Sequence, residues 1–362
     1  MNSVLQGLFA SNLYRENLIH SQFKEGSTGK ALQQLFARLG HVDSPSTDAI
    51  ALANAMSIKV SVQEDAEEFM LKLIHEVDES STGTDAASRI SSTQLPSAAV
   101  QFNTEQTIEC MNVDLTKRKS QTNLDLSVDI QDQDTLEEAL RAHFTPELLT
   151  GDSQYNAGAE NGGMQDAIKS LYLIPDSLPD TLIVHLKRFS FDPSTFEMCK
   201  IGNALDIPME IDLKEFLALN GKTDTDSEVE EGYTTSSSST SGSDSSSTSS
   251  SPIESVYDLS AVVIHEGALD FGHYYCLART STLPIYESNS ISSKSNSSKS
   301  SKKKKRRKDS ESSWVKLNDH VVSTVSEEQV LQLARGAPYR GIGAYGSSSS
   351  NAYLVFYTRR RH

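Results

Sequence analysis

The chain has 362 residues, of which 37% are hydrophobic, and its formal net charge is −16 at pH 7. It contains no run of 18 apolar residues and no charged start followed by an apolar stretch, so we expect neither a transmembrane helix nor a signal peptide. Its three cysteines form no Cys-x-x-Cys pair, which argues against a disulfide framework and against a cysteine-type zinc site and favours a reducing compartment.

Residues 1–80 show helical periodicity. Apolar residues recur at helical spacing in MNSVLQGLFAS (1–11), in TGKALQQLFARL (28–39) and in 61–80, where Ser61 and Glu64 form a capping-box pattern. A domain rarely begins on the first residue of an apolar helix, because chain ends are usually loose. We therefore expect the intact protein to continue in front of Met1. Residues 81–100 are small and polar and predict a loop.

From residue 101 the period changes to two, which indicates half-buried strands. Single strands are predicted at 107–115, 122–130, 180–191 and 351–359, and two strands around a turn at 257–280. A short helix is predicted at 135–144 with Asp134 as its N-cap.

Two segments are too poor in apolar residues to offset their ordering entropy. They are 222–252, rich in acidic residues and serine, and 281–313, rich in serine and lysine. We interpret both as disordered insertions in surface loops. The second contains KKKKRRK (302–308), a candidate nuclear import signal or a solubilising stretch, and the rest of the chain is even more acidic than the whole. Such a body disfavours nucleic acid and favours a basic partner.

His273 lies in GHYYCL (272–277), directly after Gly272. A glycine there would permit a substrate backbone to approach a catalytic histidine. The alternative is a strand histidine packed at a sheet edge.

Asn318 and Asp319 lie in WVKLNDHVV (314–322), where either could orient an imidazole or simply form a turn. His273 and Asn318 are 45 residues apart, and the Ser/Lys-rich segment accounts for 33 of these. The remaining length suits a connection between antiparallel neighbours. We therefore predict that the two residues meet.

A nucleophile for this pair is missing from the chain. Cys276 lies three residues after His273 and so points to the opposite face of a strand, Cys199 has no glycine turn or helix start beside it, and Cys110 lies in an alternating strand. All three are interpreted as small hydrophobic residues.

These blocks together resemble the ubiquitin-specific proteases, the papain-like cysteine deubiquitinases. The matching blocks, in family order, are MNSVLQGLF (1–9), QEDAEEF (63–69), LPDTLIVHLKRF (178–189), VVIHEG with GHYYCL (262–277) and WVKLNDHVV. Residues 151–171 most resemble the herpesvirus-associated subtype. Most relatives carry zinc-binding cysteines near the position of Asn156, Ala157 and Gly158, so the resemblance implies no metal and no cofactor.

The resemblance implies an α+β thumb–palm–fingers fold that occupies 1–362 as one catalytic-type domain with two disordered insertions. The implied parts are a helical thumb (1–100), fingers (101–177) and a palm (178–221, 253–280 and 314–358).

The implied activity is thiol-dependent hydrolysis of the bond after the C-terminal glycine of ubiquitin. Its catalytic residues would be His273, Asn318 and Asp319, and its substrate-binding residues Gln63, Asp65, Gly272 and Tyr274. Glu64 and Glu67 are interpreted as part of a solvated helix face.

In the family the nucleophilic cysteine lies two positions before the methionine that matches Met1. Two explanations stay open: an active protease read from an internal methionine, or a catalytically dead protein that only binds ubiquitin. A basic interaction protein built around 302–308 is a third. The expected partners are ubiquitin and ubiquitinated proteins, without nucleic acid or membrane, and the expected state is a monomer in the cytoplasm or nucleus.

Overall fold

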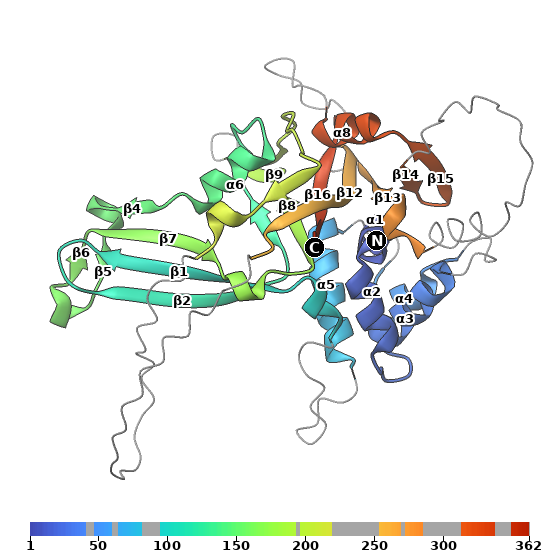
Figure 1. Ribbon diagram of the computed structural model, residues 1–362, viewed down its shortest axis with the longest axis horizontal. Coiled ribbons are helices and arrows are strands. Elements are labelled where there is room, and N and C mark those ends of the chain that lie inside the picture. Colours follow the sequence, from blue (N-terminus) through green and yellow to red (C-terminus); the bar gives the residue numbers. More distant parts are fainter. Residues whose placement is uncertain are drawn as a thin grey trace, which may run out of the picture.

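The computed structural model describes residues 1–40, 47–59, 64–81, 95–192, 196–218, 253–268, 272–284, 313–336 and 349–361. It has mixed α+β architecture, as predicted: Figure 1 shows the N-terminal helices on one side, a large sheet in the middle and a long, narrow sheet extending away from the helices. Within these ranges, none of the helices is both long and apolar enough to cross a membrane.

The predicted helical character of the N-terminal region is confirmed. The helices are α1 (Asn2–Ala10), α2 (Asn12–His20), α3 (Thr28–Leu39), α4 (Ile50–Ala55) and α5 (Ala66–Glu79). The apolar stripe of α5 is buried throughout, and α1 packs on the large sheet with Val4 and Leu8 fully buried.

Two local predictions in this region need correction. Helix α5 is capped by Asp65, whose side chain accepts hydrogen bonds from the amides of Glu67 and Glu68; Ser61, the expected cap, lies outside the described residues. The expected polar loop at 81–100 ends in a 3₁₀ turn, Pro96–Ala99, that packs on α2 and α5. Ala99 and Val100 are fully buried there, because the small side chains fit between the two helices.

The large sheet has eight strands in the order β15-β14-β13-β12-β16-β8-β3, with β11 paired to β12. The bounds are β3 (Leu126–Val128), β8 (Thr181–Leu186), β11 (Glu210–Asp212), β12 (Val256–Gly267), β13 (Gly272–Arg279), β14 (Trp314–Asn318), β15 (Val321–Val325) and β16 (Ser349–Arg359). Only the β3–β8 pair is parallel. The predicted strand pair at 257–280 is confirmed as β12 and β13.

Each face of this sheet carries a hydrophobic core. Helices α1 to α5 cover one face, and α6 (Leu136–Phe144) and α8 (Glu327–Arg335) contribute to the core on the other. The cap of α6 is Thr135, in a capping box with Glu138, rather than the predicted Asp134. Helix α8 has the same type of cap, Ser326 with Gln329, and was not predicted.

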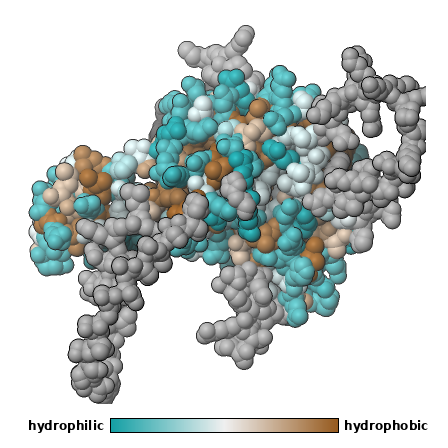
Figure 2. All heavy atoms as spheres, in the orientation of Figure 1, coloured by the Kyte–Doolittle hydropathy of each residue, from teal (hydrophilic) through white to brown (hydrophobic). Residues whose placement is uncertain are grey.

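The narrow sheet has the order β2-β1-β7-β4. Its strands are β1 (Phe102–Cys110), β2 (Thr116–Asn123), β4 (Glu147–Leu149) and β7 (Ala167–Leu173), and two small hairpins are β5 (Tyr155–Asn156) with β6 (Met164–Gln165) and β9 (Phe189–Asp192) with β10 (Glu197–Lys200). The predicted fingers, 101–177, are therefore not one unit, since β3 and α6 pack with the large sheet. Figure 2 shows apolar residues at the far end of the narrow sheet, where Leu148, Met164 and Ile168 are exposed.

The insertion predicted at 222–252 lies outside the described residues. Most of the one predicted at 281–313 does too, but its first residues fold: the 3₁₀ turn Thr280–Thr282 leads to Leu283, which is only 4% exposed. The predicted boundary was wrong because one leucine in a serine- and threonine-rich stretch gives no periodic signal.

Candidate active site

The structure brings His273 and Asn318 together. Strand β13, which contains His273, pairs with β14, which ends at Asn318. The His273 Nε2 and Asn318 Oδ1 atoms are 2.5 Å apart, and the imidazole side chain is 47% exposed. The predicted contact is therefore confirmed, whereas the catalytic role of either residue stays a prediction.

Asp319 is the second partner of this histidine. Its Oδ2 lies 3.8 Å from His273 Nε2, and its Oδ1 accepts a hydrogen bond from Asn2 Nδ2 at 2.9 Å. Asp319 occupies the two-residue turn between β14 and β15 with a φ of 51°, a left-handed conformation that Asp adopts more readily than most residues. The Asn-Asp sequence therefore forms a turn and also faces the histidine. The contact with Asn2 places the start of α1 beside His273.

Asp65 lies at the start of α5 and is fully engaged by the protein. Its Oδ1 caps the helix, and its Oδ2 accepts a hydrogen bond from the Tyr353 hydroxyl at 2.5 Å. The backbone of Ala66 lies close enough to the Tyr274 hydroxyl to oppose, in part, the rise of the Tyr274 pKa. Burial raises the pKa of both Tyr274 and Tyr353, and the nearby Asp65 carboxylate adds to this. Asp65 and Tyr274 therefore help to join α5 to the large sheet.

Gly272 is close to another side chain, not to open space. A Cβ atom on Gly272 would collide with the imidazole of His265, which is 1% exposed. Burial, and then the positive charges of Lys200 and Arg188, lower the pKa of His265 to about 4, so a neutral ring packs against Gly272. His265 therefore fills the side of Gly272 on which a Cβ atom would lie, and the role of Gly272 in substrate binding stays a prediction. Gln63 lies outside the described residues.

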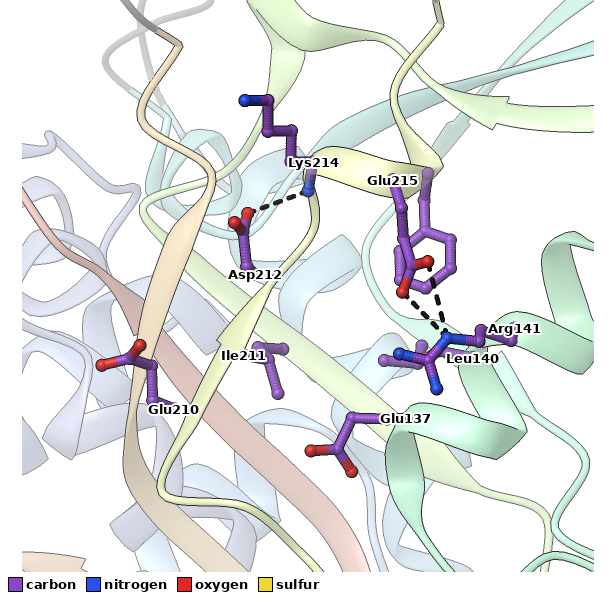
Figure 3. A pocket seen from close by; sticks show the side chains of 9 residues that line it. Glu137, Leu140, Arg141, Glu210, Ile211, Asp212, Lys214 and Glu215 are labelled. Carbon is purple, nitrogen blue, oxygen red and sulfur yellow. Dashed lines mark hydrogen bonds and ion pairs between the residues drawn. The ribbon is translucent and has the colours of Figure 1, made fainter.

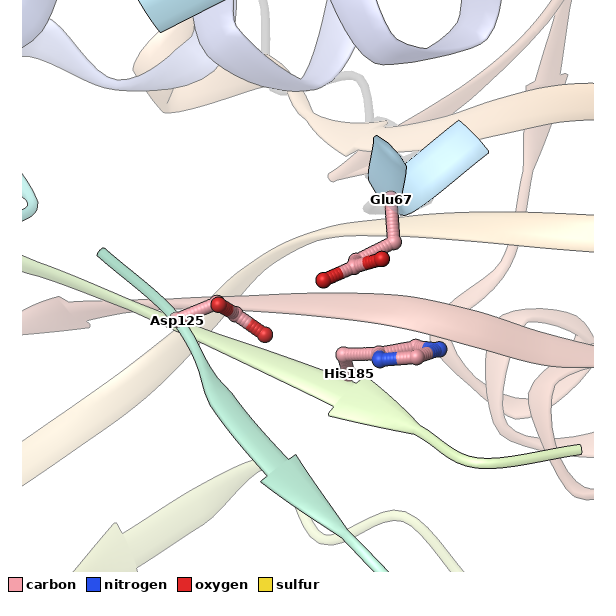
Figure 4. Close-up of side chains that lie close together, drawn as sticks. All are labelled: Glu67, Asp125 and His185. Atoms are coloured by element: carbon pink, nitrogen blue, oxygen red, sulfur yellow. The ribbon is translucent and has the colours of Figure 1, made fainter. Parts of the chain in front are cut away.

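Glu67 was expected on a solvated helix face, and that prediction was wrong: the side chain is half-buried between α5 and the large sheet. Its carboxylate, that of Asp125 and the imidazole of His185 point toward one another, and one ligand atom from each lies within 4.8 Å of the others (Figure 4). Burial, and then the charges of Asp125, Asp65 and Glu68, raise the pKa of Glu67 to about 7. Sequence reasoning missed this cluster because its members come from three distant segments; Glu64 is exposed, as expected.

Cys110 and Cys276 are buried, as predicted, whereas Cys199 is only partly buried. Cys276 is fully buried, and burial raises the pKa of its thiol. Cys110 is buried at the end of β1 beside Ala167, and Cys199 lies on β10 opposite Ser190. No thiol of this chain therefore belongs to the group around His273.

A pocket of about 470 Å³ lies elsewhere, between α6 and the segment that follows β11 (Figure 3). Its charged groups are mostly paired, as in the ion pair of Arg141 with Glu215 at 3.1 Å and the hydrogen bond from the Lys214 amide to Asp212 at 2.9 Å. It contains none of the predicted site residues.

The model of the family "Ubiquitin carboxyl-terminal hydrolase" matches residues 1–357. Ubiquitin carboxyl-terminal hydrolase 15 of Schizosaccharomyces pombe is 26% identical over 99% of this chain and 27% of its own length. Ubiquitin carboxyl-terminal hydrolase 7 of Drosophila melanogaster is 25% identical over 99% of this chain and 26% of its own length. The chain thus spans about a quarter of the length of these relatives.

Among solved structures, the chain is similar to one in the SAGA Ubp8/Sgf11/Sus1/Sgf73 DUB module bound to ubiquitin aldehyde. The TM-score is 0.65 at 23% identity, covering 100% of this chain and 67% of that one. This likeness shows the fold, and the family match spans nearly the whole sequence. The chain therefore belongs to the ubiquitin carboxyl-terminal hydrolase family.

Proposed function

We propose that the chain is the catalytic domain of a ubiquitin-specific protease, which hydrolyses the bond after the C-terminal glycine of ubiquitin. The observation that carries the proposal is the 2.5 Å contact between His273 and Asn318, at the ends of neighbouring strands and beside the start of α1. The pair combines a titratable ring with an amide that can fix its orientation.

The geometry assigns a task to each group. If Asn318 Oδ1 accepts a hydrogen bond from the N–H at His273 Nε2, the neutral ring carries its lone pair on Nδ1, which can take the proton of a thiol. The thiolate would attack the carbonyl carbon of the terminal glycine and form a thioester, while the imidazolium returns its proton to the departing amine. Asp319, 3.8 Å away, would stabilise the imidazolium. Water would then hydrolyse the thioester and release the thiol.

The nucleophile, in this proposal, is a cysteine that precedes Met1 in the active protein, as the family resemblance implies. Two observations support this. Asn2 bonds to Asp319, so a residue just before α1 would lie close to His273. The start of a helix also lowers the pKa of a nearby thiol, because the helix dipole favours the thiolate. Residues 1–362 alone should then bind ubiquitin without cleaving it.

Ubiquitin as substrate is supported by the acidic character of the chain, whose formal net charge is −16 at pH 7. The C-terminal tail of ubiquitin is basic, so an acidic partner suits it. One similar solved structure contains ubiquitin aldehyde and another contains monoubiquitin. We also propose the herpesvirus-associated subtype, on the basis of residues 151–171.

The test is to extend the chain at its N-terminus with Gly-Asn-Thr-Cys-Tyr and to measure hydrolysis of a fluorogenic ubiquitin substrate. We expect activity in the extended protein, none in residues 1–362, and loss of activity on His273→Ala. The matched control is His320→Ala, an exposed histidine in the adjacent turn, which should keep activity. If the extended protein is folded and binds ubiquitin but stays inert, the alternative of a dead ubiquitin-binding protein is correct.

For localisation we propose the cytoplasm and the nucleus, with the basic run at 302–308 as the import signal. A reporter fused to residues 290–312 should accumulate in the nucleus. An even distribution that Lys304→Ala with Arg306→Ala does not change would contradict this.

A further inference from the structure

We propose that Glu67, Asp125 and His185 form a binding site for a divalent transition-metal cation of the zinc type, which links α5 to the large sheet. The donor set is one imidazole nitrogen and two carboxylate oxygens, and the three ligand atoms lie within 4.8 Å of one another. An imidazole with two carboxylates is a set that Zn²⁺ accepts in proteins, with water as the fourth ligand.

The three side chains come from elements that the fold fixes independently. Glu67 is in the first turn of α5, Asp125 directly precedes β3, and His185 is in β8. Ser127 pairs with His185 in the parallel β3–β8 ladder, so Asp125, two residues before Ser127, lies on the same face of the sheet. Figure 4 shows Glu67 reaching toward this face from the helix.

Neighbouring groups hold the ligands in place. Ser127 Oγ is 3.0 Å from Asp125 Oδ2 and 2.7 Å from His185 Nδ1, so one hydroxyl contacts two of the three ligands. The ring of Tyr353 packs edge-on against the His185 ring, with centroids 4.9 Å apart. Such outer contacts orient metal ligands in protein sites.

The two carboxylates give the site negative charge, which a bound cation would balance. Glu67 and Asp125 are both partly buried, and in the part of the chain that the structure describes neither forms an ion pair with a lysine or arginine. Zinc bonds of ~2.1 Å would place the three ligand atoms ~3.4 Å apart in a tetrahedral site. Since no two of the three ligand atoms are more than 4.8 Å apart, each needs to move by less than about 1 Å.

The test is calorimetric titration of chelator-treated residues 1–362 with Zn²⁺, without ubiquitin, so that the result does not depend on the proposed activity. We expect one saturable site. Glu67→Gln, Asp125→Asn and His185→Gln should each weaken it at least ~10-fold, and Ser127→Ala should do so to a smaller extent. Each variant should keep the metal-free thermal midpoint within a few degrees, which shows that it is folded.

Two matched controls lie on the same helix. Glu68→Gln changes the neighbouring carboxylate, and His75→Gln removes an exposed histidine whose Nε2 is 3.2 Å from Glu79 Oε1. Both should bind Zn²⁺ like the parent. X-ray absorption at the zinc edge should show nitrogen and oxygen ligands without sulfur. Loss of the site on His75→Gln, a sulfur ligand, or retention of affinity in all three ligand variants would overturn the proposal.

Discussion

Two histidines of this protein each lie near polar side chains and a carboxylate, but they differ in exposure and in how their partners are brought to them. His273 lies at the exposed end of β13 and contacts an amide and a carboxylate from the adjacent turn. His185 lies half-buried in β8 and contacts Ser127, with two carboxylates from elements distant in sequence. The first group is assembled by neighbouring strands, whereas the second exists only because a helix crosses a sheet. The group around His273 therefore suits the proposed proton transfer. The group around His185 suits a link between the helices and the large sheet.

The largest effect should come from the partners of His273 in the extended protein. Asn318→Ala should lower kcat roughly 10²-fold, because the imidazole loses the acceptor that orients it. Asp319→Ala should cost less than about tenfold, because that carboxylate is farther away and 50% exposed. Steady-state kinetics on the fluorogenic substrate measures both. If Asp319→Ala is the more damaging change, the roles of the two residues are reversed.

A second effect concerns the contact between Gly272, the residue before His273, and the ring of His265. Gly272→Ala should lower the free energy of unfolding by ~1–3 kcal/mol, because its methyl group would overlap the His265 ring. Chemical denaturation measures this change. Combined with His265→Ala, the glycine substitution should cost much less than on its own, since the clash is removed. Equal costs in the two backgrounds would show that the ring is not what excludes the methyl group.

A feature of this structure could be predicted from the sequence when local sequence patterns determine it. A feature that brings together segments distant in the sequence could not. The contact of His273 with Asn318 was predictable, because it follows from two strand patterns and a plausible connection. The cap of α5 was placed four residues early, since both Ser61 and Asp65 fit a cap pattern. The parallel pairing of β3 with β8 brings together residues 58 apart, Ser127 and His185, and no local pattern reports it. The burial of Glu67 was unpredictable for the same reason.

Leu283 provides a third test, with an effect of about 2 kcal/mol. Replacing 286–312 by a Gly/Ser linker should leave the thermal midpoint unchanged within a few degrees. Replacing 281–312 by a linker that preserves the overall length should destabilise the protein by about 2 kcal/mol, because it removes the buried Leu283 side chain. It also disturbs the segment whose Thr282 carbonyl accepts a hydrogen bond from Arg15 Nη1 at 3.2 Å. Equal midpoints for the two proteins would show that Leu283 contributes nothing.

The smallest expected effect is a gain of stability at Glu67. Burial and neighbouring carboxylates raise its pKa to about 7, so the folded protein binds this proton more tightly than the unfolded chain does. The stability that the protonated form provides is present below the ordinary glutamate pKa and is lost as the pH rises toward 7. Because Glu67 is only half-buried, we discount the effect to about 1 kcal/mol.

Glu67→Gln should therefore raise the thermal midpoint by about 2 °C at pH 7.5 in the presence of a chelator, and by less at pH 5, where Glu67 itself is protonated. Glu64→Gln, an exposed change just before α5, should have no such effect and serves as the matched control. With Zn²⁺ present the order should invert, because the parent gains binding energy that the variant lacks. If the variant is less stable than the parent without metal, the Glu67 carboxylate already has a stabilising partner in the protein. Its position would then be like that of the Asp65 carboxylate, which accepts hydrogen bonds from the start of α5 and from Tyr353.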